Sequence, residues 1–398
     1  MKRLKNKRIL IGVTGGIAVY KVVDLISRLK KQGAEVKVIM TEHATKFVTP
    51  LTFQTLSKNV VYTDMFASLS NMDVEHISLA KWADLILVAP ATANTIAKID
   101  LGLADNMLTT VLLAKRSPVM IAPAMNTYML NHKATQEHLK NLEKNGYIIL
   151  PCDQGLLACG DAGSGKLLAP EKILEAIQDH FTVKDLEGVD IVVTAGGTRE
   201  PIDPVRYIGN RSSGKMGYAI AEAAKKRGAR VHLISANSSL PVPEGIDYIP
   251  IETTEELYRE ASSLFDSCDV YISPAAPADY RPKDYFDQKI KHKDQEALSI
   301  NLTSNPDIIK NLAKRKKKQI MVAFAAESQN LVEHAKEKLE SKNVDFIVAN
   351  NIKKKDAGFA TDTNIVTIID KDSAIDYAKQ TKKDLAEIIL NKIVKLLG

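Results

Sequence analysis

The chain has 398 residues, which is long enough for two domains with complete hydrophobic cores. Apolar residues make up 45% of it and charged residues 26%, proportions that are typical of globular proteins. The formal net charge of +6 suits small anionic substrates, but it is too weak to indicate a nucleic-acid partner, and no aromatic residues are interleaved with a basic stripe.

Membrane insertion and disulfide bonding are not expected. No apolar run approaches the roughly 20 residues of a membrane-spanning helix. The basic N-terminus leads into Ile9–Val13, which is too short for a signal-peptide core. Cys152, Cys159 and Cys268 are an odd number of cysteines without a CxxC pair, so we expect neither a disulfide framework nor a zinc site. The chain is therefore predicted to be cytoplasmic.

The first half alternates between strand and helix patterns. Apolar strands are predicted over residues 8–13, 35–40, 84–89, 118–122 and 147–150. Helices are predicted over 16–31, 45–57, 76–82, 92–99, 105–115 and 127–144. This alternation indicates a parallel sheet with helices on both faces. The glycine-rich stretch 152–169 is predicted to be a loop, and Pro170–His180 a closing helix with proline in its first turn.

The pattern restarts near residue 185, and a boundary at 183–188 gives domains of residues 1–185 and 186–398. Strands are predicted over 190–194, 230–234, 246–249, 269–273, 319–323, 345–348 and 364–369. Helices are predicted over 214–228, 253–266, 305–315, 328–341 and 380–397. Ala275–Ser299 is predicted to be a loop after a strand, where α/β sheets bind ligands. The fold class is α/β, with two Rossmann-like three-layer domains and parallel-rich sheets.

Each half opens with an apolar strand that runs into a glycine turn, Arg8–Gly16 in the first and Asp190–Thr198 in the second. Such a turn exposes backbone N–H groups at the start of a helix, where a phosphate can bind. Gly160–Lys166 nearly spells a nucleotide-binding P-loop, but Leu167 replaces the hydroxyl residue that binds magnesium and no clear strand precedes it. An ATPase of that class is therefore rejected.

Polar residues of the first half follow predicted strand ends. Thr41, Thr92 and Asn94 outline a flat cofactor pocket at the rim of the sheet. Asn126 also follows a strand, and both a helix-capping role and an amide that clamps a substrate carboxylate remain open. His76 is either a surface histidine at a helix start or a functional group.

Cys159 lies in a glycine-rich segment, where a chemical role is plausible.

In the second half, Asn210–Gly217 opens a helix with polar and cationic groups that suit a carboxylate or phosphate. The alternative is that Ser212 or Ser213 acts as an ordinary N-cap. Asp279 is placed at the edge of the sheet where ligands bind. Lys289–Lys291 puts two lysines on one face of an extended segment, and a solvated edge with no binding role is the alternative.

Taken in order, these motifs resemble the bacterial bifunctional phosphopantothenoylcysteine decarboxylase/phosphopantothenate–cysteine ligase family of coenzyme A biosynthesis. In the first half the resemblance is carried by Thr14–Ala18, His76, Pro90–Thr95, Pro123–Asn126 and Ala158–Asp161. In the second half it is carried by Thr194–Arg206, Asn210, Ala275–Tyr280, Lys289–Lys291, Asn305–Ile309, Phe324–Glu327, Lys338 and Lys342. The chain departs from the family pattern at Leu130, where tryptophan is usual, and at His292, where lysine is usual.

The resemblance implies a C-terminal ligase that acts first, on CTP, 4′-phosphopantothenate and L-cysteine. An acyl-cytidylate and pyrophosphate form, and the cysteine amine then releases CMP. Lys289 would stabilise charge on the phosphate, Asn210 and Arg206 would position the acyl group, and Mg²⁺ would bridge the triphosphate. The CTP site implied by the family consists of Ser273, Pro274, Ala275, Asp279, Lys289, Asn305, Pro306, Asp307, Ile308, Phe324, Lys338 and Lys342.

The resemblance also implies an N-terminal flavodoxin-like flavoprotein domain, in which FMN provides an electron sink for decarboxylation of 4′-phosphopantothenoylcysteine. His76 would act as base, Asn126 would hold the carboxylate, and Cys159 would donate a proton as a neutral thiol. The implied FMN site consists of Gly15, Gly16, Ile17, Thr41, Ala91, Thr92, Ala93 and Asn94. Trimers of this half, with sites shared between subunits, and dimers of the ligase half would build a homo-oligomer, a dodecamer.

Two other classes of protein remain open from the residues alone. Glu42 follows the second strand, about where a nicotinamide-dependent oxidoreductase places the acid that binds a ribose, but GxGxxG is absent from residues 12–17. A non-catalytic flavin-binding partner protein would retain Gly15 and Asn94 but would not turn over CTP.

Overall fold

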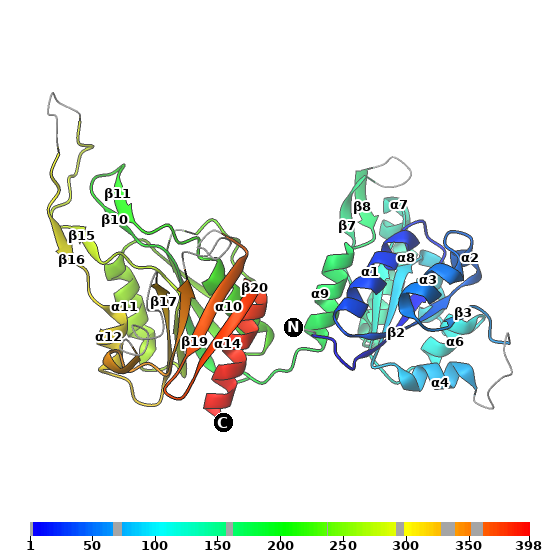
Figure 1. Ribbon diagram of the computed structural model, residues 1–398. Coiled ribbons are helices and arrows are strands. Elements are labelled where there is room, and N and C mark those ends of the chain that lie inside the picture. The colour runs from blue at the N-terminus through cyan, green and yellow to red at the C-terminus, as the bar shows by residue number, and fades with distance from the viewer. Residues whose placement is uncertain are drawn as a thin grey trace. The chain divides into compact units, whose positions relative to one another are not determined.

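The computed structural model describes residues 3–66, 74–156, 162–236, 238–291, 298–327, 339–351 and 361–398. The chain forms two compact units, Met1–Phe181 and Thr182–Gly398, and each has its own sheet and core (Figure 1). Within the described ranges, no helix combines the length and the apolar character needed to cross a membrane.

The sheet of the first unit is parallel throughout, in the order β3-β2-β1-β4-β5-β6. Its strands are β1 (Arg8–Val13), β2 (Glu35–Met40), β3 (Val61–Tyr62), β4 (Leu85–Ala91), β5 (Val119–Pro123) and β6 (Ile148–Ile149). Without the two-residue edge strand β3, which was not predicted, this is the flavodoxin-like order 2-1-3-4-5. The predicted α/β class with a parallel sheet is confirmed.

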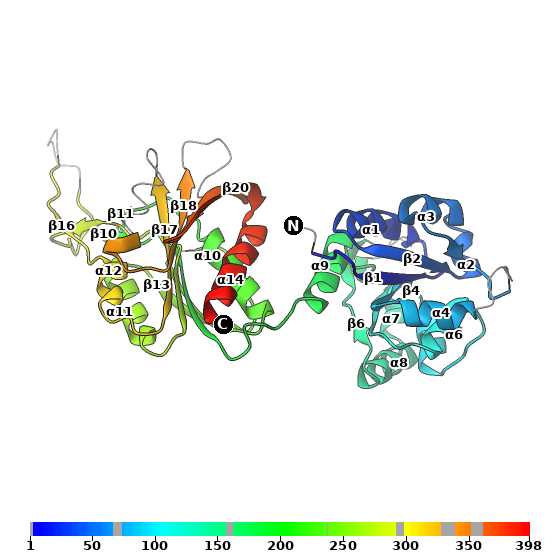
Figure 2. The ribbon, with the colours of Figure 1, turned by 60° about the horizontal axis from the view of Figure 1, so that its bottom comes forward.

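Two helical layers cover this sheet (Figure 2). One layer holds α1 (Val19–Lys31), α3 (Pro50–Ser57) and α9 (Pro170–His180), and the other holds α4 (Glu75–Trp82), α5 (Ala93–Asp100), α6 (Met107–Leu113) and α8 (Lys133–Lys144). Side chains alternate along β1, so Ile9 and Ile11 pack toward the first layer and Leu10 toward the second. The buried faces of β1 explain why its sequence is a continuous apolar run.

Two predicted helices are broken in the structure. The helix expected over 45–57 begins only at Pro50, as α3, and the short helix α2 (Glu42–Thr45) precedes it. Pro50 lacks the N–H of a helix interior and therefore starts a new helix. The helix expected over 127–144 is divided into α7 (Thr127–Asn131) and α8 at His132, whose ψ of 135° is extended. The ring Nδ1 of His132 accepts a hydrogen bond from the N–H of Ala134 at 3.3 Å and caps α8.

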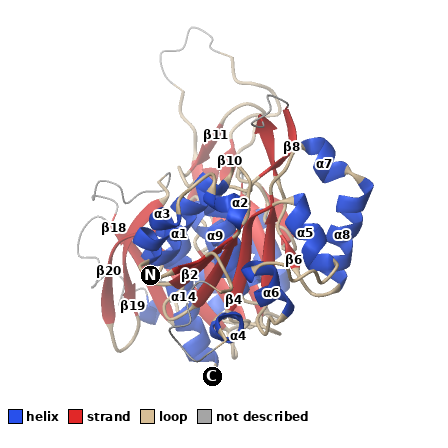
Figure 3. Cartoon of the chain, turned by 90° about the vertical axis from the view of Figure 1, so that its right-hand side faces the viewer, coloured by secondary structure: helices blue, strands red, loops and turns tan. Residues whose placement is uncertain are grey.

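The loop predicted over 152–169 is wrong, because this stretch contains an antiparallel hairpin of β7 (Asp153–Leu156) and β8 (Ala162–Lys166). Gly155 and Gly165 have φ angles of 145° and 129°, which other residues rarely adopt. Their missing side chains remove the alternation by which strands are recognised. Figure 3 shows β8 beside α7, where the Oγ1 of Thr127 donates to the carbonyl of Ser164 at 2.6 Å.

The sheet of the second unit has the order β13-β12-β9-β14-β17-β18-β19-β20. Its strands are β9 (Asp190–Gly196), β12 (Arg230–Ala236), β13 (Asp247–Ile251), β14 (Val270–Ser273), β17 (Ile320–Glu327), β18 (Phe346–Asn351), β19 (Thr363–Ile369) and β20 (Ala374–Thr381). The first six in this order are parallel, and only β19 runs the other way, because it pairs antiparallel with both β18 and β20. The predicted parallel-rich sheet is therefore confirmed. One face carries α10 (Lys215–Lys226) and α14 (Lys382–Leu397), and the other α11 (Thr254–Phe265) and α12 (Ile308–Ala313) (Figure 2).

Short strands escaped prediction in this unit. They are β10 (Arg199–Pro201), β11 (Tyr207–Gly209), β15 (Tyr280–Pro282), β16 (Leu302–Ser304) and β20. Three residues are too few to show a period, and most of β20 is exposed, so it lacks an apolar face. The hairpins β10–β11 and β15–β16 pack together beside the sheet (Figure 1). The helix predicted over 328–341 lies almost wholly outside the described residues.

Candidate functional site

A cavity of about 540 Å³ opens at the carboxyl ends of β1 and β4 in the first unit. These two strands flank the point where the strand order reverses, which is where open α/β sheets bind ligands. Its volume lies within the range of small-molecule sites. Five of the residues predicted to hold a cofactor line it, namely Gly15, Gly16, Ile17, Thr92 and Ala93.

A buried threonine joins the two turns that form this rim. The hydroxyl of Thr14 donates to the carbonyl of Pro90 at 2.6 Å and accepts from the N–H of Thr92 at 3.1 Å. The hydroxyl of Thr92 in turn accepts from the N–H of Thr95 and caps α5. Thr14 was not among the predicted site residues, although a hydroxyl residue directly before two glycines was a signal available in the sequence.

Two lysines at this cavity were also missed. The Nζ of Lys21 donates to the carbonyl of Leu167 at 3.3 Å, and Lys166 lies close enough for its charge to act on Lys21. Burial lowers the pKa of Lys21, and the charge of Lys166 lowers it further. The rest of the lining is mainly apolar and includes Met125 and Met129. Exposed backbone at a glycine turn, apolar walls and cations at the edge fit a flat aromatic ring that carries a phosphate.

Asn126 performs the capping role that the sequence left open. Its Oδ1 accepts from the N–H of Tyr128 at 2.8 Å at the start of α7, and the same residue lines the cavity. The other predicted residues lie elsewhere. Thr41 caps α2, Ala91 is buried in β4, and neither these nor the exposed Asn94 lines this cavity.

His76 lies in the first turn of α4 and does not line the cavity of its own chain. Cys159 lies outside the described residues. The structure therefore brings Asn126 to the glycine turn but leaves His76 apart from it.

Gly165 supports this cavity, and we expect substitution there to be destabilising. A Cβ on Gly165 would lie 2.3 Å from the carbonyl oxygen of Met125, in a backbone conformation with φ of 129°. Gly165→Ala is expected to lower the free energy of unfolding by about 2–4 kcal/mol, because it adds a clash to backbone strain. Gly146→Ala is the matched control, because its φ is 80° but nothing lies within 4 Å of the added Cβ. Equal shifts of the denaturation midpoint in the two variants would contradict this role.

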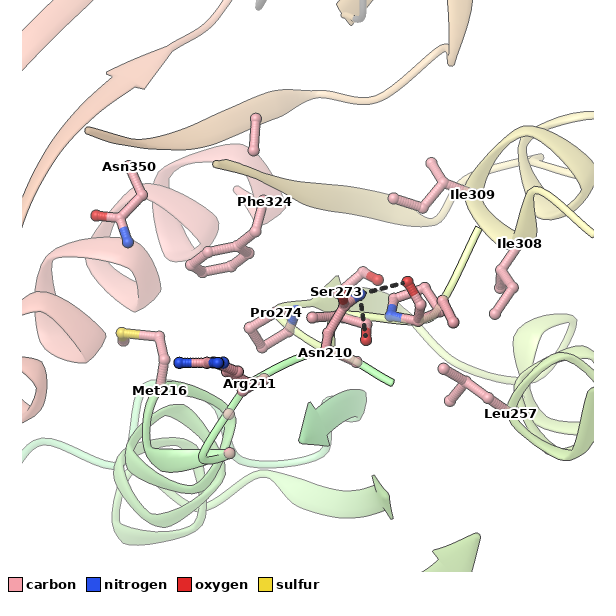
Figure 4. Close-up of a pocket in the computed structure, with 18 of the residues that line it drawn as sticks. Asn210, Arg211, Met216, Leu257, Ser273, Pro274, Ile308, Ile309, Phe324 and Asn350 are labelled. Carbon is pink, nitrogen blue, oxygen red and sulfur yellow. Dashed lines mark hydrogen bonds between the residues drawn. The ribbon is translucent and has the colours of Figure 1, made fainter. Parts of the chain in front are cut away.

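A second cavity, of about 570 Å³, opens at the carboxyl ends of β14 and β17 in the second unit (Figure 4). The amide nitrogen of Asn210 donates to the carbonyls of Ala276 at 3.2 Å and Pro277 at 3.0 Å. A bridge between Gly197 and Ala276 joins the turn after β9 to the loop after β14. The strand order of this sheet reverses between β9 and β14, so the second cavity, like the first, adjoins a reversal point.

Two fully buried threonines hold the loop after β14. The hydroxyl of Thr194 accepts from the N–H of Ala275 at 3.2 Å, and the hydroxyl of Thr198 accepts from the N–H of Ala278 at 2.9 Å. Sequence reasoning missed both roles, because their partners are about 80 residues away in the chain.

Most of the predicted nucleotide-binding residues meet in this second cavity. Asn305 donates from its backbone N–H to the carbonyl of Asp279 and from its side chain to the carbonyl of Ala278. Asp307 caps α12 and pairs with Lys342, whose Nζ lies 3.1 Å from its Oδ2. The predicted residues that line the cavity are Asn210, Ser273, Pro274, Ala275, Asp279, Asn305, Pro306, Asp307, Ile308, Phe324 and Lys342. Lys338 lies outside the described residues.

Arg206 and Lys289 do not line this cavity, and a buried carboxylate links them. Oδ2 of Asp203 accepts from Nε of Arg206 at 2.9 Å and from the N–H of Ile290 at 3.1 Å. Arg206 also donates to the carbonyl of Ile290 at 2.8 Å. The Arg206 guanidinium and three backbone N–H groups hold the pKa of the Asp203 carboxyl well below its usual range. The backbone next to the exposed Lys289 is therefore tied to β10–β11 through Asp203.

The alternative in which Ser212 or Ser213 acts as the N-cap of α10 is wrong. The N-cap is Gly214, whose φ is 76° and which has no side chain to make a cap. No group of three or more His, Cys, Asp or Glu side chains suited to a metal ion occurs in the ranges that the structure describes.

Comparison with known proteins assigns both halves. A family model described as "Flavoprotein" matches residues 1–182, and one described as "DNA/pantothenate metabolism flavoprotein C-terminal domain" matches residues 186–397. The coenzyme A biosynthesis bifunctional protein CoaBC of Bacillus subtilis is 48% identical over 99% of this chain and 98% of its own length. That of Borreliella burgdorferi is 45% identical over 97% of this chain and 98% of its own length.

A crystal structure of the C-terminal domain of a coenzyme A biosynthesis bifunctional protein CoaBC covers 54% of this chain and 98% of its own, at 40% identity and a TM-score of 0.47. The matches to the bacterial relatives span nearly the whole chain, and the two family models divide it between them. The chain therefore belongs to the family of coenzyme A biosynthesis bifunctional proteins.

Proposed function

We propose that this protein catalyses two steps of coenzyme A biosynthesis in the cytoplasm. The second unit joins L-cysteine to 4′-phosphopantothenate at the expense of CTP, and the first unit decarboxylates the product to 4′-phosphopantetheine with FMN as cofactor. The observation that carries this proposal is the presence of two cavities at the reversal points of two sheets, in a chain that matches bifunctional relatives almost end to end.

In the ligase cavity, the carboxylate of 4′-phosphopantothenate attacks the α-phosphorus of CTP and displaces pyrophosphate. The cysteine amine then attacks the acyl carbon and displaces CMP. This chemistry needs charge neutralisation and positioning more than covalent help. Asp279, Asn305 and Phe324 line the space proposed for the nucleotide, and Asn210 lies beside the loop after β14 where the acyl group is proposed to bind. Mg²⁺ is proposed to be held mainly by the triphosphate.

Lys289 and Arg206 are proposed to complete this site through the tether at Asp203. We expect Asp203→Asn to lower ligase kcat by about tenfold or more, because an amide oxygen accepts weakly and the Ile290 segment loses its charged anchor. As a control, decarboxylation of supplied 4′-phosphopantothenoylcysteine by the same variant should be unchanged. Because the Asp203 side chain is fully buried and is proposed to act through Arg206, adding Arg206→Ala to Asp203→Asn should cost less than the two single effects combined. Fully additive effects would show that the tether does not work through Arg206.

In the decarboxylase cavity, FMN when bound supplies the electron sink that lets the cysteine carboxylate leave as carbon dioxide. Gly15 and Gly16 are proposed to receive its phosphate, and Ile17, Met125 and Met129 to contact its ring. The amide of Asn126 is proposed to hold the substrate carboxylate. Because His76 does not line the cavity of its own chain, we propose that a neighbouring subunit supplies it, in trimers of this unit.

Cys159 is proposed as the proton donor of the reductive half, and dimers of the ligase unit are proposed to join the trimers into a dodecamer. Light scattering coupled to size-exclusion chromatography measures that mass directly.

The two activities are tested separately on the purified full-length protein. Ligase activity should appear as pyrophosphate release that requires CTP, 4′-phosphopantothenate and cysteine together, and CTP should exceed ATP as substrate. Decarboxylase activity should appear as 4′-phosphopantetheine formed from 4′-phosphopantothenoylcysteine. The cofactor released by heat should have the visible spectrum of a flavin. A nicotinamide spectrum would favour an oxidoreductase, and a flavin without either turnover would favour a binding partner protein.

A further inference from the structure

A buried carboxyl group of the second unit has no role in the proposed function. Glu200, in β10, is 1% exposed and does not line the second cavity. Its Oε1 accepts twice from Thr254, the first residue of α11: from the backbone N–H at 3.0 Å and from the hydroxyl at 2.7 Å. Glutamate is almost never buried to this extent unless its carboxyl group has bonding partners. Glu200 therefore holds the start of α11 from the interior.

A chain of hydrogen bonds leads from Glu200 to the loop after β14. The hydroxyl of Thr254 lies 3.0 Å from the hydroxyl of Thr198, and the latter accepts from the backbone N–H of Ala278 at 2.9 Å. Both threonines are fully buried. Water does not compete for buried groups of this kind, so each bond depends strongly on its neighbours.

Glu200 fixes the direction of every bond in this chain. A threonine hydroxyl has one proton, and that of Thr254 is given to Oε1 of Glu200. The oxygen of Thr254 must therefore accept the proton of Thr198. The oxygen of Thr198 is then left to accept from the N–H of Ala278, which is the bond found.

Ala278 passes this order on to a residue of the cavity. Its carbonyl accepts from Nδ2 of Asn305 at 2.9 Å, and the carbonyl of Asp279 accepts from the backbone N–H of Asn305 at 2.8 Å. Asn305 lines the cavity on the side proposed for the nucleotide. Earlier carbonyls of the same loop accept from the amide of Asn210 (Figure 4).

We propose that Glu200 is a positioning residue of the ligase reaction, which holds Asn305 in place through Thr254, Thr198 and Ala278. This inference deepens the proposed function and rests on it. Without the carboxyl group, the N–H of Thr254 loses its buried acceptor and both hydroxyl protons can turn to other partners. The Ala278 peptide then has no fixed acceptor, and the nucleotide side of the cavity is no longer preorganised.

The test compares Glu200→Ala with Glu256→Ala in the full-length protein. Glu256 serves the same end of α11, because its Oε2 accepts from the N–H groups of Glu252 at 2.7 Å and Thr253 at 3.2 Å, and it does not line the cavity. Glu200→Ala should raise KM for CTP about fivefold or more and leave KM for cysteine within about twofold. Glu256→Ala should lower the denaturation midpoint and leave both KM values within about twofold, because loss of folded enzyme lowers the apparent kcat but not KM.

Conservative variants separate hydrogen bonding from charge. Glu200→Gln retains an oxygen at the same reach, so its KM for CTP should stay within about threefold of wild type. Glu200→Asp retains the charge but is one methylene shorter, so it should resemble Glu200→Ala. Thr254→Val removes the hydroxyl in the middle of the chain and should raise the same KM. If Glu200→Ala fails to fold, Thr254→Val decides by the same criteria.

The proposal is overturned if Glu200→Ala or Thr254→Val leaves KM for CTP unchanged, if Glu256→Ala raises it equally, or if Glu200→Asp retains what Glu200→Gln loses. Hydrogen exchange measured by mass spectrometry provides a readout besides activity. The peptide that contains the N–H of Ala278 should exchange faster in Glu200→Ala than in wild type or Glu256→Ala, and equal rates would also overturn the proposal. If the wild-type protein lacks CTP-dependent activity, the proposed function fails on its own, and the exchange rates still test the hydrogen-bond chain.

Discussion

Replacing Asn126 with aspartate is expected to abolish decarboxylation while the fold and the flavin content of the protein stay intact. Asn126 caps α7 through its Oδ1, and it also lines the cavity of the first unit. Aspartate caps a helix as well as asparagine does, so the cap contribution of about 1 kcal/mol is retained. The new negative charge would repel the substrate carboxylate that the amide is proposed to hold.

The expected loss is about 10²–10³-fold in kcat/KM, the magnitude found when a preorganised polar contact to the reacting group is removed. The measurement is formation of 4′-phosphopantetheine from 4′-phosphopantothenoylcysteine, with flavin absorbance and the denaturation midpoint recorded on the same samples. Asn126→Ser is the control, because a serine hydroxyl also caps a helix but adds no charge, and it should retain more activity than Asn126→Asp. Activity of Asn126→Asp close to wild type would remove this residue from the catalytic proposal.

Replacing Lys289 with glutamine should have the reverse effect, with the loss of ligase activity and intact decarboxylation. Lys289 is exposed beside Ile290, whose N–H and carbonyl are held by Asp203 and Arg206. We propose that its exposed ammonium reaches a substrate phosphate while its backbone is anchored. Loss of one cation that neutralises charge in phosphoryl transfer is expected to cost about 10²–10³-fold in kcat.

Pyrophosphate release measures this effect, and supplied 4′-phosphopantothenoylcysteine measures the other activity in the same preparation. Lys283→Gln is the matched control, because Lys283 is also exposed on this segment and no role is proposed for it. Loss of both activities in Lys289→Gln would contradict the division of labour between the two units. Equal losses in Lys283→Gln and Lys289→Gln would show that only the general charge of the segment matters.

Local sequence patterns predicted the strands that are buried on both faces of their sheet. The continuous apolar runs of β1, β9 and β14 could be read directly, because strands covered on both faces need no polar alternation. The hairpin β7–β8 could not be read, since glycines with positive φ supply backbone without side chains. The broken helices at Pro50 and His132 show that helical periodicity can continue across a real boundary.

The position of each cavity could be predicted from the glycine turns and the strand ends, because a parallel sheet gathers the ends of its strands at one edge. The residues that hold those ends in place did not follow. Thr14 bonds to Pro90 and Asp203 to Ile290, across 76 and 87 residues of chain. Such pairs depend on the fold, which local patterns do not encode.

The central claim is that one chain performs both steps in order, and cysteine labelled in its carboxyl carbon tests it most directly. The full-length protein is incubated with CTP, 4′-phosphopantothenate and this cysteine, and the products are analysed by mass spectrometry. The account predicts unlabelled 4′-phosphopantetheine, labelled carbon dioxide, and one CMP and one pyrophosphate for each molecule formed. Failure to incorporate cysteine, or 4′-phosphopantothenoylcysteine that accumulates with its label while FMN is bound, would contradict it.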